Sequence, residues 1–219
     1  MKIMLLTPPG RTTEKWPPLG LLYIAASIRQ KRGDDVRVVD AFCLNLDRPA
    51  VLDIIKKYGP DFIGISTSTH LFLESVEVLR EAKEALPGAT TAIGGYHATF
   101  SAEQILRAYP FVDYILKGEA EHSMPDLLDC IEAGREPAGV VGISYVRGEA
   151  YLSNPPALVE DLDGLPFPDR SLVGGVDYGY AFNGIQLTFG KFTTMNTSRG
   201  CPYQCTYCSC ASFSRRRLR

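Results

Sequence analysis

The chain has 219 residues, of which 45% are hydrophobic and 22% are charged, and its formal net charge is -2 at pH 7. This length excludes a small disulfide-stapled fold, and the near-neutral charge offers no basic field that would attract nucleic acid. The longest strongly apolar run, residues 19–28, is too short to span a bilayer, and no secretory signal opens the chain. We therefore expect a cytoplasmic protein with no nucleic-acid or membrane partner.

From residue 1 to about 146, short β-branched runs alternate with longer segments of helical period. The alternation predicts an α/β domain over residues 1–150, a doubly wound, flavodoxin- or Rossmann-like parallel sheet with helices on both faces. The expected strands are 2–6, 36–39, 62–65, 90–93, 114–116 and 141–146. The expected helices are 19–31, 50–57, 71–86, 102–108 and 123–132. Ligands of such sheets lie beyond the carboxyl ends of the strands, where the strand order reverses.

Four loops follow those carboxyl ends and contain most of the unusual residues of the chain. They span residues 7–20, 66–70, 94–99 and 117–121. Glycines in such loops let the backbone approach a bulky ligand, and hydroxyl groups at a strand end can hydrogen-bond its polar edge. The candidate ligand contacts are Pro9, Gly10, Trp16, Gly20, Ser66, Thr67, Ser68, Gly94, Gly95, His97, Gly118 and Glu119.

Several of these candidates also have a simpler structural interpretation. Gly94 and Gly95 could serve only a tight turn from strand to helix. His97 could be an ordinary hydrogen-bonded loop residue, and Trp16, which lies beside two prolines, could anchor its loop on the core. No Gly-x-Gly-x-x-Gly follows the first strand, so a nicotinamide or flavin site is not predicted.

The composition changes near residue 154. Four prolines and an acidic stretch, without sustained periodicity, predict an extended connector over residues 151–191. Residues 192–196 are then predicted to form the first strand of a second domain, which would occupy residues 192–219.

Three cysteines follow that segment on one short loop. Cys201, Cys205 and Cys208 are separated by three and then two residues, with Tyr207 just before the third. Three thiolates suit an iron–sulfur cluster that keeps one iron free of protein ligands, whereas electron-transfer clusters are held by four cysteines. The alternative is a structural zinc site with Cys210 as fourth ligand, although no second Cys-x-x-Cys half lies upstream.

The cysteine loop resembles that of the radical S-adenosylmethionine enzymes. The resemblance implies that Cys201, Cys205 and Cys208 bind a 4Fe-4S cluster and that S-adenosylmethionine chelates the free iron beside Tyr207. It also implies reductive cleavage of S-adenosylmethionine to a 5′-deoxyadenosyl radical, which abstracts hydrogen from a small-molecule or natural-product substrate. The electron would come from a donor such as flavodoxin or ferredoxin.

The first 150 residues resemble the cobalamin-binding domain that precedes the radical barrel in one large class of these enzymes. Ser66 or Ser68, and Gly94-Gly95, match in order and approximate spacing the residues that line the channel for the nucleotide tail of cobalamin. The resemblance therefore implies that the twelve candidate contacts bind cobalamin. The first loop lacks the Asp-x-His-x-x-Gly of mutase-type domains, so cobalt would have no histidine ligand from it.

These resemblances together imply a cobalamin-type radical S-adenosylmethionine enzyme that transfers a methyl group to an unactivated carbon or phosphorus. Cyclisation or rearrangement on a non-cobalamin scaffold is one alternative, and a flavodoxin-like binding module with a zinc-binding tail is another. Only about 20 residues follow Thr197. We therefore expect a fragment that ends just inside a truncated β/α barrel and is inactive alone.

Overall fold

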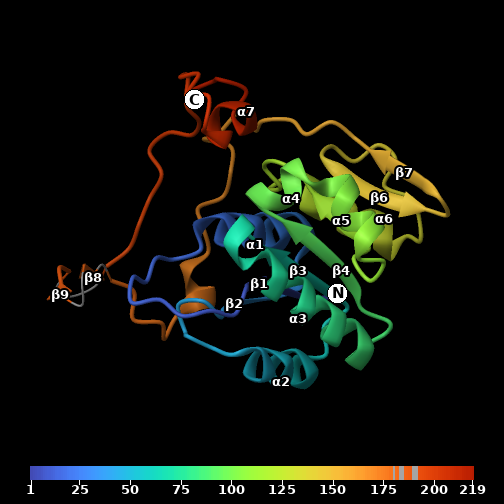
Figure 1. Ribbon diagram of the computed structural model, residues 1–219, viewed down its shortest axis with the longest axis horizontal. Helices are drawn as coiled ribbons and strands as arrows, with labels where there is room; N and C mark the ends of the chain where they lie inside the picture. The colour runs from blue at the N-terminus through green and yellow to red at the C-terminus, as the bar shows by residue number, and fades with distance from the viewer. Residues whose placement is uncertain (180, 183–184, 189–191) are drawn as a thin grey trace.

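The computed structural model describes residues 1–179, 181–182, 185–188 and 192–219. Its centre is a seven-stranded sheet in the order β2-β1-β3-β4-β5-β6-β7, with helices on both faces (Figure 1). The first five strands are parallel, and β6 and β7 are antiparallel to their neighbours. The strands are β1 (Lys2–Thr7), β2 (Asp35–Asp40), β3 (Phe62–Ser66), β4 (Thr90–Gly94), β5 (Tyr114–Leu116), β6 (Ile143–Arg147) and β7 (Ala150–Ser153). The expected α/β architecture is confirmed.

Alternate side chains of each strand enter two separate hydrophobic cores. In β1, Met4 and Leu6 belong to one core, and Ile3 and Leu5 belong to the other. The first core is covered by α2 (Arg48–Tyr58), α3 (Phe72–Ala85), α4 (Tyr96–Phe100) and α5 (Ala102–Ala108), and the second by α1 (Leu19–Arg32) and α6 (Ser123–Glu132). Because both faces are buried, the parallel strands are continuous apolar runs rather than alternating ones.

Local signals set the ends of the helices on both faces. The Asp47 side chain accepts a hydrogen bond from the Ala50 N–H and begins α2, with a proline in the first turn. Gly33 and Gly59 follow α1 and α2 in the left-handed conformation, with φ of 71° and 61°. In each case the glycine N–H bonds the carbonyl four residues earlier, which ends the helix as the sequence predicts.

The last two strands differ from expectation. The predicted strand over 141–146 forms at Ile143–Arg147, but it runs antiparallel to β5, because residues 133–142 return the chain to the carboxyl edge before β6 begins. A tight turn then adds β7, which was not predicted and which crosses the expected domain boundary at residue 150. Antiparallel strands at the edge of a mostly parallel sheet are common.

The predicted strand at residues 192–196 is wrong, since the segment lies outside every strand. A β-branched run becomes a strand only where a partner accepts its backbone hydrogen bonds. Here the Arg170 guanidinium donates instead to Thr193 Oγ1 at 2.9 Å and to the Thr194 carbonyl at 2.7 Å. Residues 192–196 are therefore tied to the connector and not to a sheet.

The predicted connector contains a short 3-10 helix, η2 (Arg170–Val173), and a small hairpin of β8 (Ala181–Phe182) and β9 (Ile185–Gln186). Residues 180, 183–184 and 189–191 of the expected connector lie outside the described residues. The division of the chain at residues 150 and 191 stays a prediction.

The connector follows the carboxyl edge of the sheet. The Val159 N–H donates to Glu119, after β5, at 2.6 Å, and the Tyr178 hydroxyl donates to Asp40, at the end of β2, at 3.0 Å. It therefore crosses from one side of the parallel sheet to the other above the ends of the strands. None of the helices in the described parts of the chain has both the length and the apolar character needed to cross a membrane.

Candidate functional site

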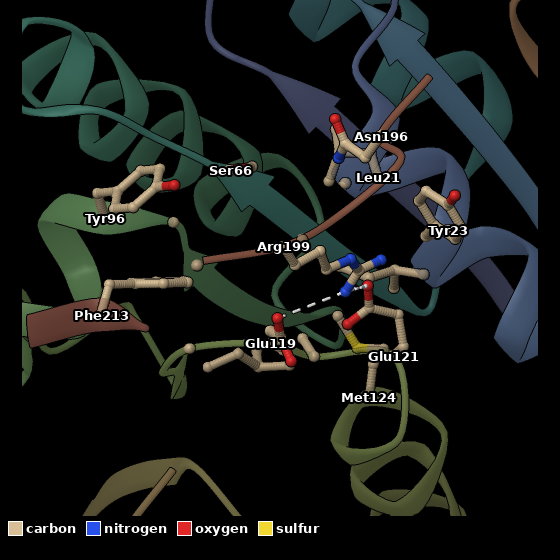
Figure 2. A pocket seen from close by; sticks show the side chains of 18 of the residues that line it. Leu21, Tyr23, Ser66, Tyr96, Glu119, Glu121, Met124, Asn196, Arg199 and Phe213 are labelled. Carbon is tan, nitrogen blue, oxygen red and sulfur yellow. Dashed lines mark ion pairs between the residues drawn. The ribbon is translucent and has the colours of Figure 1, made fainter. Parts of the chain in front are cut away.

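A cavity of about 350 Å³ lies where the carboxyl ends of the parallel strands meet α1 and α6 (Figure 2). Its walls come from the four loops that the sequence singled out and from residues 196–219, which form its roof. Six of the twelve candidate contacts line it: Gly20, Ser66, Gly94, Gly95, Gly118 and Glu119. The structure thus brings together residues from four separate loops at the expected edge of the sheet.

The depth of this cavity depends on small residues inside the strands. Gly64 in β3 is paired in register with Leu5 in β1 and with Ala92 in β4, and all three line the cavity. A Cβ on Gly64 would lie 3.0 Å from Leu5 Cδ2 and 3.7 Å from Met124 Cε of α6, so a larger side chain there would press on residues that form the cavity wall. Sequence reasoning missed Gly64 and Ala92, although a glycine inside a predicted strand often marks close approach by a ligand.

A second cavity, of about 340 Å³, lies beside the first at the same edge. Trp16, Thr67 and Ser68 line this second cavity, and Ser66 and Gly95 line both. Tyr96 and Phe213 also line both cavities, and their ring centroids are 4.5 Å apart. This aromatic pair therefore forms a wall shared by the two spaces, and it joins the first domain to the C-terminal segment.

Pro9, Gly10 and His97 line neither of these two cavities. A Cβ atom on Gly10 would lie 2.5 Å from the Phe42 ring, so close packing accounts for that glycine. The His97 ring packs on Phe72 with centroids 4.3 Å apart, and its Nδ1 lies 3.2 Å from Thr69 Oγ1. Contacts of these three residues with cobalamin stay a prediction.

The two adjacent glycines after β4 have different structural roles. Gly95 has φ of +94°, and a Cβ there would lie 2.4 Å from the Thr67 carbonyl oxygen. The Thr67 N–H donates to the Gly94 carbonyl at 3.0 Å, which holds the β3 and β4 loops together. A Cβ on Gly94 would meet only ordinary contacts, the nearest being the Leu116 oxygen at 3.6 Å. Gly95 is thus required by the backbone, whereas Gly94 leaves space in the cavity.

Within the roof, residues 199–219 form a closed loop that contains α7 (Ser209–Phe213). The backbones of Arg199 and Arg219 exchange two hydrogen bonds of 2.9 Å at its base. Inside it, the buried Ser214 hydroxyl accepts from the Cys201 N–H at 3.2 Å and donates to the Cys210 carbonyl at 2.7 Å. The cysteine motif therefore lies on a compact loop above the first cavity, of about 350 Å³, which is called the main cavity from here on.

The three cysteines of the motif are free thiols, with Cys201 half-buried and Cys205 and Cys208 exposed. Within the described ranges, no three Cys, His, Asp or Glu side chains lie close enough to hold a metal ion. Tyr207 is 91% exposed, and Cys210 lines the main cavity. The donor chemistry suits an iron–sulfur cluster, but the structure does not bring the thiols together, so their role as ligands stays a prediction.

A cluster of two carboxylates and two guanidinium groups fixes the roof to the loop that follows β5. Arg199 pairs with Glu121 at 2.7 Å and with Glu119 at 3.6 Å, and Arg219 pairs with Glu119 at 2.7 Å (Figure 2 shows the pairs of Arg199). All four side chains are at least 85% buried. The Arg199 guanidinium also lies 4.9 Å from the Tyr23 ring centroid. Sequence reasoning missed Glu121, Arg199 and Arg219, whose pairing joins residues some 80 to 100 positions apart.

Replacing Glu119 with glutamine is expected to loosen the roof. Burial opposes ionisation of Glu119, but hydrogen bonds from Arg219 and the Val159 N–H outweigh it, so its pKa lies below the ordinary value of 4.5. The ionised Glu119 therefore stabilises the folded state. This stabilisation is fully present when the pH is above the ordinary pKa, and it is lost as the pH falls through the lower pKa of the folded state. Removing one partner of a buried pair costs about 3 kcal/mol.

The rate of amide hydrogen exchange in residues 199–219 measures how firmly the roof is held. It is measured in Glu119→Gln, and in the wild type as the pH is lowered. Glu160→Gln is the matched control, because it breaks an exposed pair with Arg217. We expect exchange to be much faster in Glu119→Gln and nearly unchanged in Glu160→Gln. Equal exchange in the two variants would contradict the assigned role of the buried cluster.

The fold agrees with what comparison with known proteins finds. The family described as the B12 binding domain matches residues 10–128, which is more than half of the chain. The chain belongs to this family. The cobalamin-binding resemblance seen in the strand-end loops is thereby confirmed.

Curated relatives match most of the length of this chain. An uncharacterised methyltransferase of Pyrococcus horikoshii is 33% identical over 216 residues, which cover 95% of this chain and 45% of that protein. An anaerobic magnesium-protoporphyrin IX monomethyl ester cyclase of Rubrivivax gelatinosus is 32% identical over 199 residues, which cover 89% of this chain and 35% of that protein. The chain spans less than half the length of these relatives.

A solved structure shares the fold. The cobalamin-dependent S-adenosylmethionine radical enzyme OxsB, with aqua-cobalamin and S-adenosylmethionine bound, superposes with a TM-score of 0.71 and 22% sequence identity. The match covers 94% of this chain and 28% of OxsB. A further relative, 26% identical over 169 residues that cover 73% of this chain and 23% of that protein, is named cobalamin-dependent radical SAM methyltransferase TokK of Streptomyces tokunonensis.

Proposed function

We propose that this chain is the cofactor-binding part of a cobalamin-dependent radical S-adenosylmethionine enzyme that transfers methyl groups. The observation that carries the proposal is the cavity of about 350 Å³ at the carboxyl edge of a B12-binding fold, roofed by the cysteine loop. The same loop places Cys210 and Phe213 in the cavity wall. The proposed cobalamin site and the cysteine motif therefore adjoin each other.

The residues around the two cavities fit cobalamin. Gly64, Ala92 and Gly94 add little or no side chain to the cavity wall, and Ser66 contributes a hydroxyl group to it. No histidine lines either cavity in the portions of the chain that the structure describes. We propose that these small residues bind the cofactor by shape and that the protein supplies no imidazole to cobalt.

Cys201, Cys205 and Cys208 would hold a 4Fe-4S cluster, and Tyr207 would lie beside S-adenosylmethionine. When bound, these groups supply radical chemistry at an unactivated centre, and cobalamin supplies the methyl group. The protein's own contribution is positional, because the buried pairs of Arg199 and Arg219 with Glu119 and Glu121 hold the cysteine loop against the cobalamin cavity. A small-molecule or natural-product substrate and a donor such as flavodoxin or ferredoxin belong to the same proposal.

Cyclisation is the second candidate outcome, because one relative at 32% identity is named a cyclase. Both outcomes share the cluster site, but the cyclisation alternative has a first domain that serves as a scaffold without cobalamin, so corrin binding separates the two. The experiment is anaerobic reconstitution of the chain with iron, sulfide and hydroxocobalamin, followed by sulfide analysis and corrin absorption spectroscopy. Bound sulfide together with a shifted corrin spectrum supports the proposal. Zinc without sulfide, or an unchanged corrin spectrum, contradicts it.

A further inference from the structure

A third cavity, of about 450 Å³, lies away from the cofactor site, between α5 and the β6–β7 hairpin. Lys117 and Tyr151 line it on the side of the sheet, and Thr99, Glu103 and Arg107 line it on the side of the helices. Its volume falls within the usual range of small-molecule sites. Nothing in the proposed function uses it.

Lys117 is the unusual residue of this cavity because it is 9% exposed and no carboxylate in the described part of the chain pairs with it. Its Nζ donates to Ser153 Oγ at 2.5 Å. No Asp or Glu oxygen in the described residues lies within 4.0 Å of this Nζ, the distance limit for an ion pair. Lys83, by contrast, pairs with Asp113 at 2.7 Å. A buried ammonium group without a counter-charge is costly.

The surrounding hydroxyl groups do not neutralise this charge. Ser153 Oγ also accepts from Ser144 at 3.1 Å, and Ser144 accepts from the Tyr151 hydroxyl at 3.3 Å. These groups are neutral, and burial lowers the pKa of Lys117. An ammonium group has three N–H donors, so two of those on Lys117 have no acceptor among the residues that the structure describes.

The other charges around the cavity leave it with a net positive charge. Arg107 and Glu103 pair with each other at 2.9 Å on the exposed surface of α5. That pair cancels, and Lys117 is the uncompensated charge. We propose that this cavity is a second ligand site that binds a small oxyanion, either a carboxylate or a phosphate. Lys117 would be its buried anchor, and Arg107 would lie at its rim.

The site adjoins the cofactor cavity through the backbone. Lys117 precedes Gly118, which lines the main cavity, and the Gly118 N–H donates to Thr99 Oγ1 at 3.0 Å. Thr99 lines the oxyanion cavity. The Gly118 amide is therefore a local reporter for an occupant near Lys117, and its signal can be followed without any cofactor.

Titration of the chain with inorganic phosphate, and separately with acetate, tests the site, with chloride holding ionic strength constant. We expect a saturable NMR shift of the Gly118 amide, binding weakened about tenfold or more in Lys117→Met, and binding kept in Lys117→Arg. Lys56→Met is the matched control, because it removes the same charge from an exposed position on α2. Tighter binding of phosphate or of acetate identifies which oxyanion the site prefers.

A second measurement does not depend on the folding of any variant. In wild-type protein, the pKa of Lys117, followed through its CεH₂ resonance, is expected to rise when phosphate binds, because the anion stabilises the charged amine. Absence of a saturable shift with both anions overturns the proposal. So does equal affinity in Lys117→Met and Lys56→Met, or a pKa of Lys117 that phosphate leaves unchanged.

Discussion

Replacing Cys205 with alanine is expected to abolish the retention of inorganic sulfide and most of the iron after anaerobic reconstitution. A 4Fe-4S cluster held by three thiolates has no protein ligand to spare, so the loss of one leaves two irons without a protein bond. The same result is expected for Cys201 and Cys208. Iron and sulfide analysis of the reconstituted protein measures the effect.

Cys210→Ala is the control that separates the cluster from a zinc site. Cys210 lies two residues beyond the motif and lines the main cavity. If three thiolates hold a cluster, Cys210→Ala keeps a full complement of sulfide. If the site is tetrahedral zinc with Cys210 as the fourth ligand, Cys210→Ala loses its metal, as the alanine variants of the other three cysteines do. Full sulfide in Cys205→Ala would contradict the cluster assignment.

The exposed cysteines are consistent with a loop that closes around its cluster. Metal binding is coupled to folding, because a ligand set rarely exists in its final geometry without the metal. The base of the loop is nevertheless well fixed, since a Cβ on Gly200 would lie 1.9 Å from the Arg217 carbonyl oxygen and Gly200 has φ of +101°. The protein therefore sets the position of the loop, and we infer that the cluster would set the positions of the thiols.

The sequence was enough to predict the five parallel strands. Each is a short apolar run buried on both faces, and each is followed by a segment of helical period. It did not predict the direction of β6 or the existence of β7. Those features depend on the edge of the sheet to which residues 133–142 return the chain. That path is set by tertiary packing, and no local sequence pattern indicates it. The predicted strand at 192–196 was wrong for the same reason, since its local pattern had no partner strand.

The candidate site shows the same division. Ser66 and Gly94 were predictable because hydroxyl groups and glycines at strand ends stand out in the chain. Pairs such as Glu121 with Arg199 were not, because an ion pair across 78 residues has no pattern in the sequence. Loop chemistry can be read locally, whereas the attachment of the roof emerges only when the chain folds.

Replacing Gly94 with valine is expected to weaken cobalamin binding by about 100-fold, or about 2.7 kcal/mol, while the fold is kept. The nearest neighbours of a Cβ at this position belong to Leu116, which itself lines the cavity, so the new side chain would enter the cofactor space. Gly94 ends β4 without a left-handed φ, and valine suits a strand. Spectrophotometric titration with hydroxocobalamin measures the affinity, and thermal unfolding measures the stability.

Two neighbouring glycines make the result specific. Gly88→Val adds the same side chain at an exposed turn before β4, where a Cβ meets nothing within 4 Å, and should leave both affinity and stability unchanged. Gly95→Val should instead unfold the β3–β4 junction at a cost of about 3 kcal/mol or more, because of its φ of +94° and its contact with the Thr67 carbonyl. Unchanged affinity in a folded Gly94→Val protein would show that cobalamin does not occupy the cavity beside β4.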